Sequence, residues 1–391
     1  MIDFITPAVR YIGCDDATLD LFESQYETPA GMCYNSYLVL DDKTAIMDTA
    51  DPRCEAEWLE KLSAALDGRT PDYLILHHME PDHSGAVATV MERFPSLQVV
   101  CSAQAAKFLP QFFEHFDTKR IKVVKEGDEI CLGHHTLRFL QATFVHWPEV
   151  IMTYCPEDRL LFSADGFGKF GVYDADADDW ACEARRYYFN ICGKYGKQVA
   201  AVLDKVAALP EAPVAICPLH GPVLQGEAMA EALRLYNIWA RYEVETPGIF
   251  IAHASIHGGT AAAAKLMREK LLQAGCPKVA IADLCREDMA EAIEDAFRYG
   301  TLLCCASSYD ADVFPPMHYF LHKLSLKGYQ QRRIALLENG TWAPSAAKAM
   351  KALIEKMKDI TLIEPVVTIR SRMKSEDMPS FDRLVKALLQ D

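Results

Sequence analysis

The second part of the chain shows the most regular hydrophobic pattern. From about residue 248 onward, short apolar runs alternate strictly with longer amphipathic segments. Short apolar runs bounded by polar turns are typical of buried strands, and the longer segments are typical of helices. The expected strands are 248–255, 278–284, 300–307, 332–339 and 360–365, and the expected helices are 260–273, 287–298, 314–326, 345–358 and 379–390. Repeated strand–helix units of this length predict a parallel, doubly wound sheet.

The first part of the chain has a less regular pattern, in which strands come in clusters. Residues 36–48 contain two apolar runs around the polar pair Asp41-Asp42, which predicts two strands joined by a turn. Further expected strands are 72–78, 97–102, several short ones within 120–163, and 213–220; expected helices are 52–66, one beginning near Ser84, 180–209 and 226–243. Thr246-Pro247-Gly248 then breaks the pattern. We therefore expect two domains, residues 1–247 and 248–391.

Composition excludes several classes of protein. The 391 residues include 40 Lys and Arg against 55 Asp and Glu, a formal charge of −15, which argues against nucleic acids and anionic membranes as partners. No apolar run reaches the roughly 18 residues of a transmembrane helix, and the N-terminus lacks the pattern of a signal peptide. The 13 scattered cysteines, without any C-x-x-C pair, indicate free thiols in a reducing cytoplasm. They also exclude a rubredoxin-type or zinc-ribbon module within this chain.

Residues of the types that bind metals follow several expected strands of the first domain. Seven of them stand out: His78, Glu80, Asp82, His83, His146, Asp165 and His220. Loops at the carboxyl ends of strands are where ligand sites form. Four histidines and three carboxylates suffice for two metal ions, with one carboxylate bridging them. This set of nitrogen and oxygen ligands contains no cysteine and is harder than that of a zinc hydrolase, which favours iron or manganese.

Polar loops follow three strands of the second domain. They comprise Ser255, Ile256, His257, Gly258, Gly259 and Thr260 after the first strand, Ser307, Ser308, Tyr309 and Asp310 after the third, and Asn339, Gly340, Thr341 and Trp342 after the fourth. The first loop opens a helix, where backbone N–H groups and hydroxyls form a phosphate site. In a doubly wound sheet such loops meet at the switch point, where the strand order reverses. Tyr309 and Trp342 are then placed to flank a flat ring.

The metal-ligand pattern of the first domain resembles that of a known family. The motif His78-x-Glu80-x-Asp82-His83, completed by the three later candidates, is similar to the metallo-β-lactamase-like domain of the flavodiiron proteins, or A-type flavoproteins. Hydrolases of that fold usually carry H-x-H-x-D-H, and Glu80 in place of the second histidine marks the flavodiiron branch. Residues 26–39 and the later patterns SSYD…FPP and GTW are also similar to this family. The resemblance implies an αββα sandwich followed by a flavodoxin-like doubly wound sheet.

The resemblance also implies a role for each candidate residue. His78, Glu80 and His146 would bind one iron, Asp82, His83 and His220 would bind the other, and Asp165 would bridge the two. FMN would occupy the three loops of the second domain. Trp147 and Tyr195 would line the di-iron pocket as catalytic residues, and Glu23 stands where many members carry a histidine. We interpret His77 as a structural or surface residue.

The activity implied by the resemblance is reduction of O2 to water, of NO to N2O, or of both. Electrons would come from an external donor, such as rubredoxin or a flavin/NADH reductase, and would pass through FMN. The implied assembly is a head-to-tail homodimer or a dimer of dimers. Two alternatives stay open: a zinc hydrolase of the metallo-β-lactamase type with a passenger flavodoxin-like domain, and an FMN electron carrier with an empty metal site.

Overall fold

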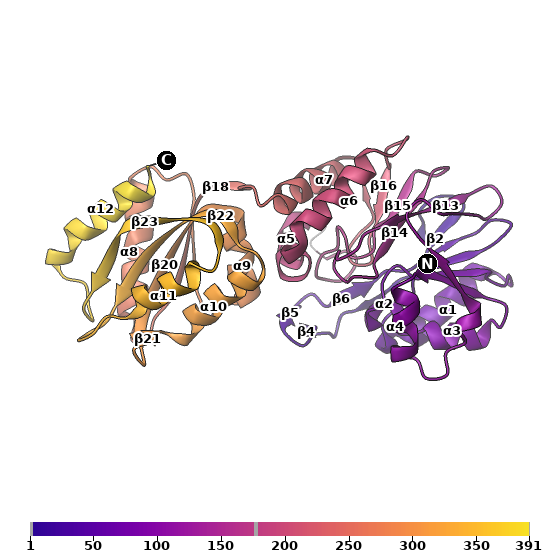
Figure 1. Cartoon of the computed structure of the whole chain (residues 1–391), viewed down its shortest axis with the longest axis horizontal. Helices are drawn as coiled ribbons and strands as arrows, with labels where there is room; N and C mark the ends of the chain where they lie inside the picture. Colours follow the sequence, from indigo (N-terminus) through magenta and orange to yellow (C-terminus); the bar gives the residue numbers. More distant parts are fainter. Residues whose placement is uncertain (1–2, 176–178, 391) are drawn as a thin grey trace. The chain divides into compact units, whose positions relative to one another are not determined.

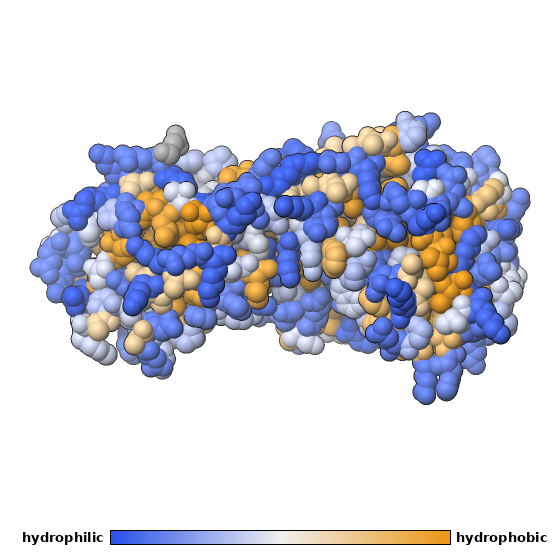
Figure 2. Space-filling model, viewed as in Figure 1, coloured by the Kyte–Doolittle hydropathy of each residue, from blue (hydrophilic) through white to orange (hydrophobic). Residues whose placement is uncertain are grey.

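The computed structural model describes residues 3–175 and 179–390. The chain divides into two compact units, Met1–Asn237 and Ile238–Asp391. The boundary that the sequence predicts, near residue 247, lies within the first strand of the second unit, β18 (Thr246–Ala254). Figure 2 shows a face that is largely hydrophilic, in keeping with the formal charge of −15. Within the described residues, no helix is both long enough and apolar enough to cross a membrane.

Two β-sheets face each other in the first unit, with helices on their outer sides (Figure 1). The strand orders are β1-β2-β7-β8-β9-β10-β11 and β12-β13-β14-β15-β16-β17. Alternate residues of each strand point into the core between the sheets, for example Tyr37 and Val39 from the first and Leu137 and Phe139 from the second. The arrangement is the αββα sandwich that the sequence predicts.

The bounds of these elements follow the apolar runs closely. The first sheet contains β1 (Asp3–Phe4), β2 (Val9–Tyr11), β7 (Tyr37–Val39), β8 (Ala45–Met47), β9 (Tyr73–Ile75), β10 (Gln98–Ser102) and β11 (Ile121–Val124). The second contains β12 (Glu129–Cys131), β13 (Thr136–Gln141), β14 (Ile151–Cys155), β15 (Leu160–Phe162), β16 (Ala215–Cys217) and β17 (Leu224–Gln225). The helices are α1 (Glu55–Leu66), α2 (Pro81–Ser84), α3 (Val87–Arg93), α4 (Ala105–Phe112), α5 (Trp180–Ile191), α6 (Gly196–Ala207) and α7 (Gly226–Ala240).

Several short elements of the first unit escape the sequence pattern. The single helix expected near Ser84 is two helices, α2 and α3, and α4 is not predicted at all. Two small antiparallel pairs, β3 (Cys14–Asp16) with β6 (Met32–Tyr34) and β4 (Leu21–Phe22) with β5 (Tyr26–Glu27), precede β7. Strands of two or three residues are too short to show an alternating pattern, so the sequence gives no sign of them.

The second unit is a five-stranded parallel sheet with the order β19-β18-β20-β22-β23. Numbered along the chain, this order is 2-1-3-4-5, which is the flavodoxin-like arrangement. The strands are β18, β19 (Val279–Asp283), β20 (Tyr299–Tyr309), β22 (Gln330–Asn339) and β23 (Lys358–Ile369), and the short β21 (Asp312–Val313) pairs with β20. The helices are α8 (Gly259–Gln273), α9 (Met289–Arg298), α10 (Pro315–Leu326), α11 (Ala346–Ile354) and α12 (Met378–Leu388). In Figure 1, α8 and α12 lie on one face of the sheet and α9, α10 and α11 on the other.

The last strand of this sheet is longer than the sequence predicts. The expected helix 345–358 ends at Ile354, and the expected strand 360–365 extends from Lys358 to Ile369. Pro365 suggests an end to the strand because proline lacks the N–H that a ladder needs. The strand continues past it because β23 is at the edge of the sheet, where proline is tolerated. The extension carries the chain to the same edge of the sheet as the three predicted loops.

A buried arginine holds the start of the second unit to its sheet. Arg332 of β22 is 3% exposed. Its guanidinium donates hydrogen bonds to the carbonyl oxygens of Tyr299 at 2.9 Å, Phe297 at 2.6 Å and Glu243 at 2.9 Å, and also to that of Tyr242. These carbonyls come from three separate segments, so a single side chain fixes the strand, the preceding helix end and the segment before β18.

Arg332→Lys is expected to destabilise the second unit by on the order of 3 kcal/mol. A lysine ammonium keeps the charge but cannot span carbonyls that lie on several sides of a planar guanidinium, and each buried carbonyl left without a donor costs about 1–3 kcal/mol. The free energy of unfolding by denaturant measures the effect. Arg383→Lys, at an exposed position of α12, is the matched control and should change it little. Equal stability of the two variants would contradict this role of Arg332.

Candidate functional site

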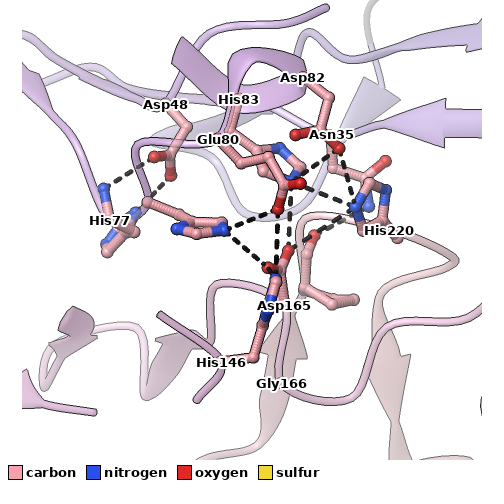
Figure 3. Close-up of polar contacts among 12 residues, drawn as sticks. Asn35, Asp48, His77, Glu80, Asp82, His83, His146, Asp165, Gly166 and His220 are labelled. Carbon is pink, nitrogen blue, oxygen red and sulfur yellow. Dashed lines mark hydrogen bonds and ion pairs between the residues drawn. The ribbon is translucent and has the colours of Figure 1, made fainter. Parts of the chain in front are cut away.

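The seven candidate metal ligands come together in the first unit. Figure 3 labels all of them except His78. His78 and Glu80 follow β9, and the next two candidates lie in α2. His146 lies between β13 and β14, Asp165 follows β15, and His220 follows β16. The side chains form two groups, each with ligand atoms within 4.8 Å of one another: His78, Glu80, His146 and Asp165, and Asp82, His83 and His220. We call these group 1 and group 2.

Group 1 is held together by two carboxylates facing two imidazoles. An oxygen of Glu80 lies 3.1 Å from Nε2 of His78 and 3.2 Å from Nε2 of His146. Oδ2 of Asp165 lies 3.3 Å from the same nitrogen of His78 and 3.1 Å from that of His146. Four donor atoms therefore surround one small volume.

Group 2 has a similar geometry and shares one residue with group 1. Nε2 of His83 and Nε2 of His220 are 3.1 Å apart, and Oδ2 of Asp82 lies 3.3 Å and 3.4 Å from them. Oδ1 of Asp165 lies 3.1 Å from His83 and 3.6 Å from His220. Because Oδ2 of Asp165 faces group 1 and Oδ1 faces group 2, this carboxylate is placed to bridge two ions.

The burial and spacing of the donor atoms suit two bound metal ions. Both carboxylate oxygens of Asp82 and of Asp165 are buried and have no hydrogen-bond donor. Such oxygens need a cation, because an unpaired buried carboxylate is strongly unfavourable. Ligands bound at about 2.0–2.2 Å around one ion lie about 3.0–3.5 Å apart, which is the spacing seen in both groups. The absence of thiolates from the set suits iron.

The pKa values within the cluster also favour the binding of cations. Burial by itself would lower the pKa of His146, but the facing carboxylates of Asp165 and Glu80 raise it to about 9. The pKa values of His78 and His83 are raised against burial in the same way, and that of Asp165 is lowered against burial by the facing imidazoles. In the metal-free protein, protons on the histidines therefore occupy the place of metal charge.

Metal binding by the metal-free protein is expected to strengthen as the pH rises through about 9. A histidine must lose its proton to bind a metal, and the proton on His146 is held up to about pH 9. The same raised pKa stabilises the metal-free fold below about pH 6.5 and ceases to do so as the pH passes through about 9. Titration calorimetry with ferrous iron in buffers of different ionisation enthalpy measures the proton release. An affinity that does not change with pH would contradict this account.

Glu149 contacts the ring nitrogen of His78 that faces away from the other donor atoms of group 1. It was not predicted from the sequence. Its carboxylate lies 2.7 Å from Nδ1 of His78 and accepts a hydrogen bond from the backbone N–H of Met79 at 3.0 Å. On the other side, Nδ1 of His220 lies 2.7 Å from the carbonyl oxygen of Cys33. Each contact leaves Nε2 free for a metal, because the partner at Nδ1 fixes the proton there.

Glu149→Gln is expected to weaken metal binding at group 1 by about 10–100-fold, because partners of ligating histidines typically contribute that much. Group 2 should keep its affinity, since its His220 depends on a different partner. Competition with a chelator, followed by metal analysis, measures the loss of one ion before the other. Glu92→Gln, at an exposed position of α3, is the matched control. Equal loss of both ions would show that Glu149 supports the fold rather than one site.

Three further residues named from the sequence have aromatic or polar partners in the first unit. Trp147 packs edge-on against His78, with ring centres 5.1 Å apart. Tyr195 stacks on Phe144, with ring centres 5.1 Å apart, and its part in the reaction stays a prediction, as does that of Trp147. His77 is buried and bonds to Asp48 and, at 2.7 Å, to Thr153. This is in keeping with its structural interpretation.

The β4–β5 hairpin carries Glu23 to the cluster. Glu23 and Ser24 have φ of 48° and 56°, which is typical of a type I′ turn. Phe22 of this hairpin packs edge-on against His220, with ring centres 5.5 Å apart. Loss of solvent raises the pKa of Glu23, and the charge of Glu80 raises it further. Glu23 thus adds negative charge close to group 1.

The three predicted loops of the second unit also come together. The hydroxyls of Thr260 and Ser307 are 2.8 Å apart, and the side-chain N–H of Asn339 donates to Thr260 at 3.3 Å. These contacts join the start of α8 to the ends of β20 and β22. Ser307, Ser308 and Tyr309, which the sequence places in a loop, are the last residues of β20, and Asn339 is the last residue of β22. The Ser308 hydroxyl accepts hydrogen bonds from backbone N–H groups at the start of α11, 2.8 Å and 3.2 Å away. All of these residues lie at the carboxyl edge of the parallel sheet, the position expected for a ligand site.

This edge fits a phosphorylated, flat ligand such as FMN. Gly258 precedes α8 with φ of 82°, and a Cβ there would meet nothing within 4 Å, so the N-terminus of this helix is open to an anion. Trp342 and Tyr309 are 86% and 46% exposed. Large exposed aromatic side chains beside an open polar loop are suited to stacking on a ring.

Comparisons with known proteins agree with both units. The family described as "ODP family beta lactamase" matches residues 32–221. The nitric oxide reductase of Moorella thermoacetica is 28% identical over 382 residues, covering 96% of this chain and 94% of that protein. The anaerobic nitric oxide reductase flavorubredoxin of Vibrio vulnificus is 27% identical over 88% of this chain and 71% of its own length.

Solved structures show the same two-domain fold. The rubredoxin oxygen:oxidoreductase of Desulfovibrio gigas superposes with a TM-score of 0.93 at 22% identity, covering 99% of this chain and 98% of that chain. The flavodiiron protein of Giardia intestinalis superposes with a TM-score of 0.89 at 20% identity, covering 99% and 96%. With the paired metal groups and the flavodoxin-like sheet already described, these matches show that the chain belongs to the flavodiiron family of oxidoreductases.

Proposed function

We propose that this chain reduces O2 to water, NO to N2O, or both, at a di-iron site supplied with electrons through FMN. The observation that carries the proposal is the placement of Asp165, whose two oxygens face the two metal groups separately. Among the relatives, the Moorella protein is named a nitric oxide reductase and the Desulfovibrio structure a rubredoxin oxygen:oxidoreductase. Both substrates therefore belong to the proposal.

In this proposal His78, Glu80 and His146 hold one iron, Asp82, His83 and His220 hold the other, and Asp165 holds both. Bound iron would supply the redox chemistry for a diatomic substrate at this site, and bound FMN would supply the electrons. The carboxylates balance the charge of the ions in either oxidation state. Glu149 orients His78 through its 2.7 Å contact, and Trp147 covers one edge of the same ring.

The flavin would lie on the loops after β18, β20 and β22. Thr260, Ser307 and Asn339 fix these loops to one another, and Tyr309 and Trp342 would flank the ring. The donor in this proposal is an external carrier, rubredoxin or a flavin/NADH reductase. A head-to-tail homodimer, or a dimer of dimers, would bring the FMN of one subunit to the irons of the other.

Anaerobic stopped-flow tests the proposal directly. The fully reduced protein is mixed separately with NO and with O2 while flavin absorbance is followed. Fast reoxidation by at least one gas is expected, and the faster gas is the preferred substrate. His83→Ala should leave only the slow reaction of the flavin itself, whereas His134→Ala, at an exposed position, is the matched control. Unchanged turnover in His83→Ala would rule out the di-iron mechanism.

The two alternatives give different results in the same preparation. A zinc hydrolase would retain zinc after purification with both metals present, and would show no oxidation of the flavin by either gas beyond the uncatalysed rate. A pure electron carrier would react equally well with and without His83. The bridging position of Asp165 and the presence of Glu80 favour the reductase.

A further inference from the structure

A fourth loop, which the sequence did not indicate, lies at the candidate flavin site. It follows β23 and runs from Arg370 to Lys374. The backbone N–H of Ser371 donates to the side-chain oxygen of Asn339 at 2.9 Å, and the side-chain N–H of Asn339 donates back to the Ser371 carbonyl at 3.1 Å. The hydroxyls of Ser371 and Thr341 are 2.8 Å apart. This loop is therefore fixed to the loop after β22 by three hydrogen bonds.

The same loop packs directly on the start of α8. A Cβ added at Gly259 would come within 2.3 Å of the Ser371 carbonyl oxygen, so only glycine permits this approach. Ser371 has φ of 66°, and the N–H of Arg372 donates to the carbonyl of Arg370 at 2.9 Å. Together these features describe a γ-turn with positive φ, which is rare and strained for a residue other than glycine. Strain of this kind persists where the surroundings hold it, and it is concentrated at ligand sites.

The turn brings two arginines to an edge where the loops after β18, β20 and β22 contain no lysine or arginine. The loop Ser255–Thr260 contains no lysine or arginine. A phosphate monoester carries about −1.5 to −2 charge at neutral pH, whereas a helix N-terminus supplies only about +0.5. Arg370 and Arg372 are both exposed and form no ion pair within the described part of the chain. The one side-chain hydrogen bond seen for Arg370 is to the carbonyl of Thr341, at 3.4 Å.

We infer that Arg370 and Arg372, in this fourth loop, belong to the flavin site and neutralise the phosphate group of FMN. The inference rests on the proposed function, because it requires FMN at this edge. No ion pair is seen for either arginine within the described residues, and an anionic ligand at this edge would give both a partner. The paired hydrogen bonds of Asn339 to Ser371 hold the turn between the two arginines against Gly259 at the start of α8.

Flavin binding by the metal-loaded, flavin-free full-length protein tests this inference. Quenching of flavin fluorescence gives the affinities for FMN and for riboflavin, which has the same ring but no phosphate. The double variant R370Q/R372Q is expected to bind FMN at least tenfold more weakly, with an unchanged affinity for riboflavin. R370K/R372K should recover most of the FMN affinity, because it keeps the charge. R383Q, on the exposed side of α12, is the matched control for overall charge.

The test distinguishes a failure of this inference from a failure of the proposed function. Equal weakening of FMN and riboflavin in R370Q/R372Q would show that the arginines only support the loop, and would overturn the inference. An unchanged FMN affinity would overturn it as well, and would leave the proposed function intact. If the unmodified protein bound neither flavin, the proposed function itself would fail.

Discussion

Asp165→Asn is expected to leave the protein with one tightly bound iron instead of two and to slow the reduction of O2 and NO by about a thousandfold. The asparagine side chain offers one neutral oxygen in place of two charged ones, so it cannot serve group 1 and group 2 together. Oδ2 lies 3.1 Å from His146 and Oδ1 lies 3.1 Å from His83, and both contacts lie in the buried part of the cluster. A metal centre contributes several kcal/mol to lowering a reaction barrier, and about 4 kcal/mol corresponds to a thousandfold in rate.

The measurement for this variant is iron per chain by mass spectrometry, followed by stopped-flow with each gas. Asp67→Asn is the matched control, because Asp67 ends α1 in the left-handed conformation with φ of 47°, which asparagine also adopts readily. It should keep both irons and full turnover. Two tightly bound irons in Asp165→Asn would mean that another group bridges them, and full turnover would mean that no bridge is needed.

The clustering of the candidate metal ligands was predictable from the sequence, and the reason is local. Each candidate ligand directly follows an apolar run, and the carboxyl ends of neighbouring strands meet whatever their order in the chain. The structure brings all seven together in two groups. Glu149 was missed because its contact with His78 joins residues 71 positions apart. A glutamate three residues after a candidate histidine has many other possible positions, and no pattern singles out this one.

In the second unit, too, local sequence patterns predicted the elements, whereas contacts between residues far apart in the chain were missed. The alternation of apolar runs and amphipathic segments predicted the parallel sheet, and the polar loops after its strands do meet at one edge. The loop after β23 was missed because Pro365 suggested an early end to the strand. Its place beside Gly259 depends on the packing of α12 and α8 on the same face, which no short motif records. Its two arginines are also ordinary surface residues by sequence alone.

The separation of the chain into two units makes metal removal a second test with a large effect. Both metal groups belong to the first unit, and both lie among its buried loops. An ion that binds only the folded state stabilises it by about 4.1 kcal/mol when its concentration is 1,000 times the dissociation constant. Two such sites would contribute roughly 8 kcal/mol. For a unit of this size each kcal/mol shifts the melting temperature by about 2–4 °C.

Stripping the metals with a chelator is therefore expected to lower the melting temperature of the first unit by about 16–32 °C and to leave that of the second unit unchanged. Calorimetry of the metal-free protein should show two transitions, and Arg332→Lys identifies the second unit because its guanidinium contacts only that unit. The lower transition should return to its original temperature on adding ferrous iron. Zinc that restores it more effectively than iron would favour the hydrolase alternative. If both transitions moved together on metal removal, the ions would be stabilising the whole chain, and the assignment of both sites to the first unit alone would be wrong.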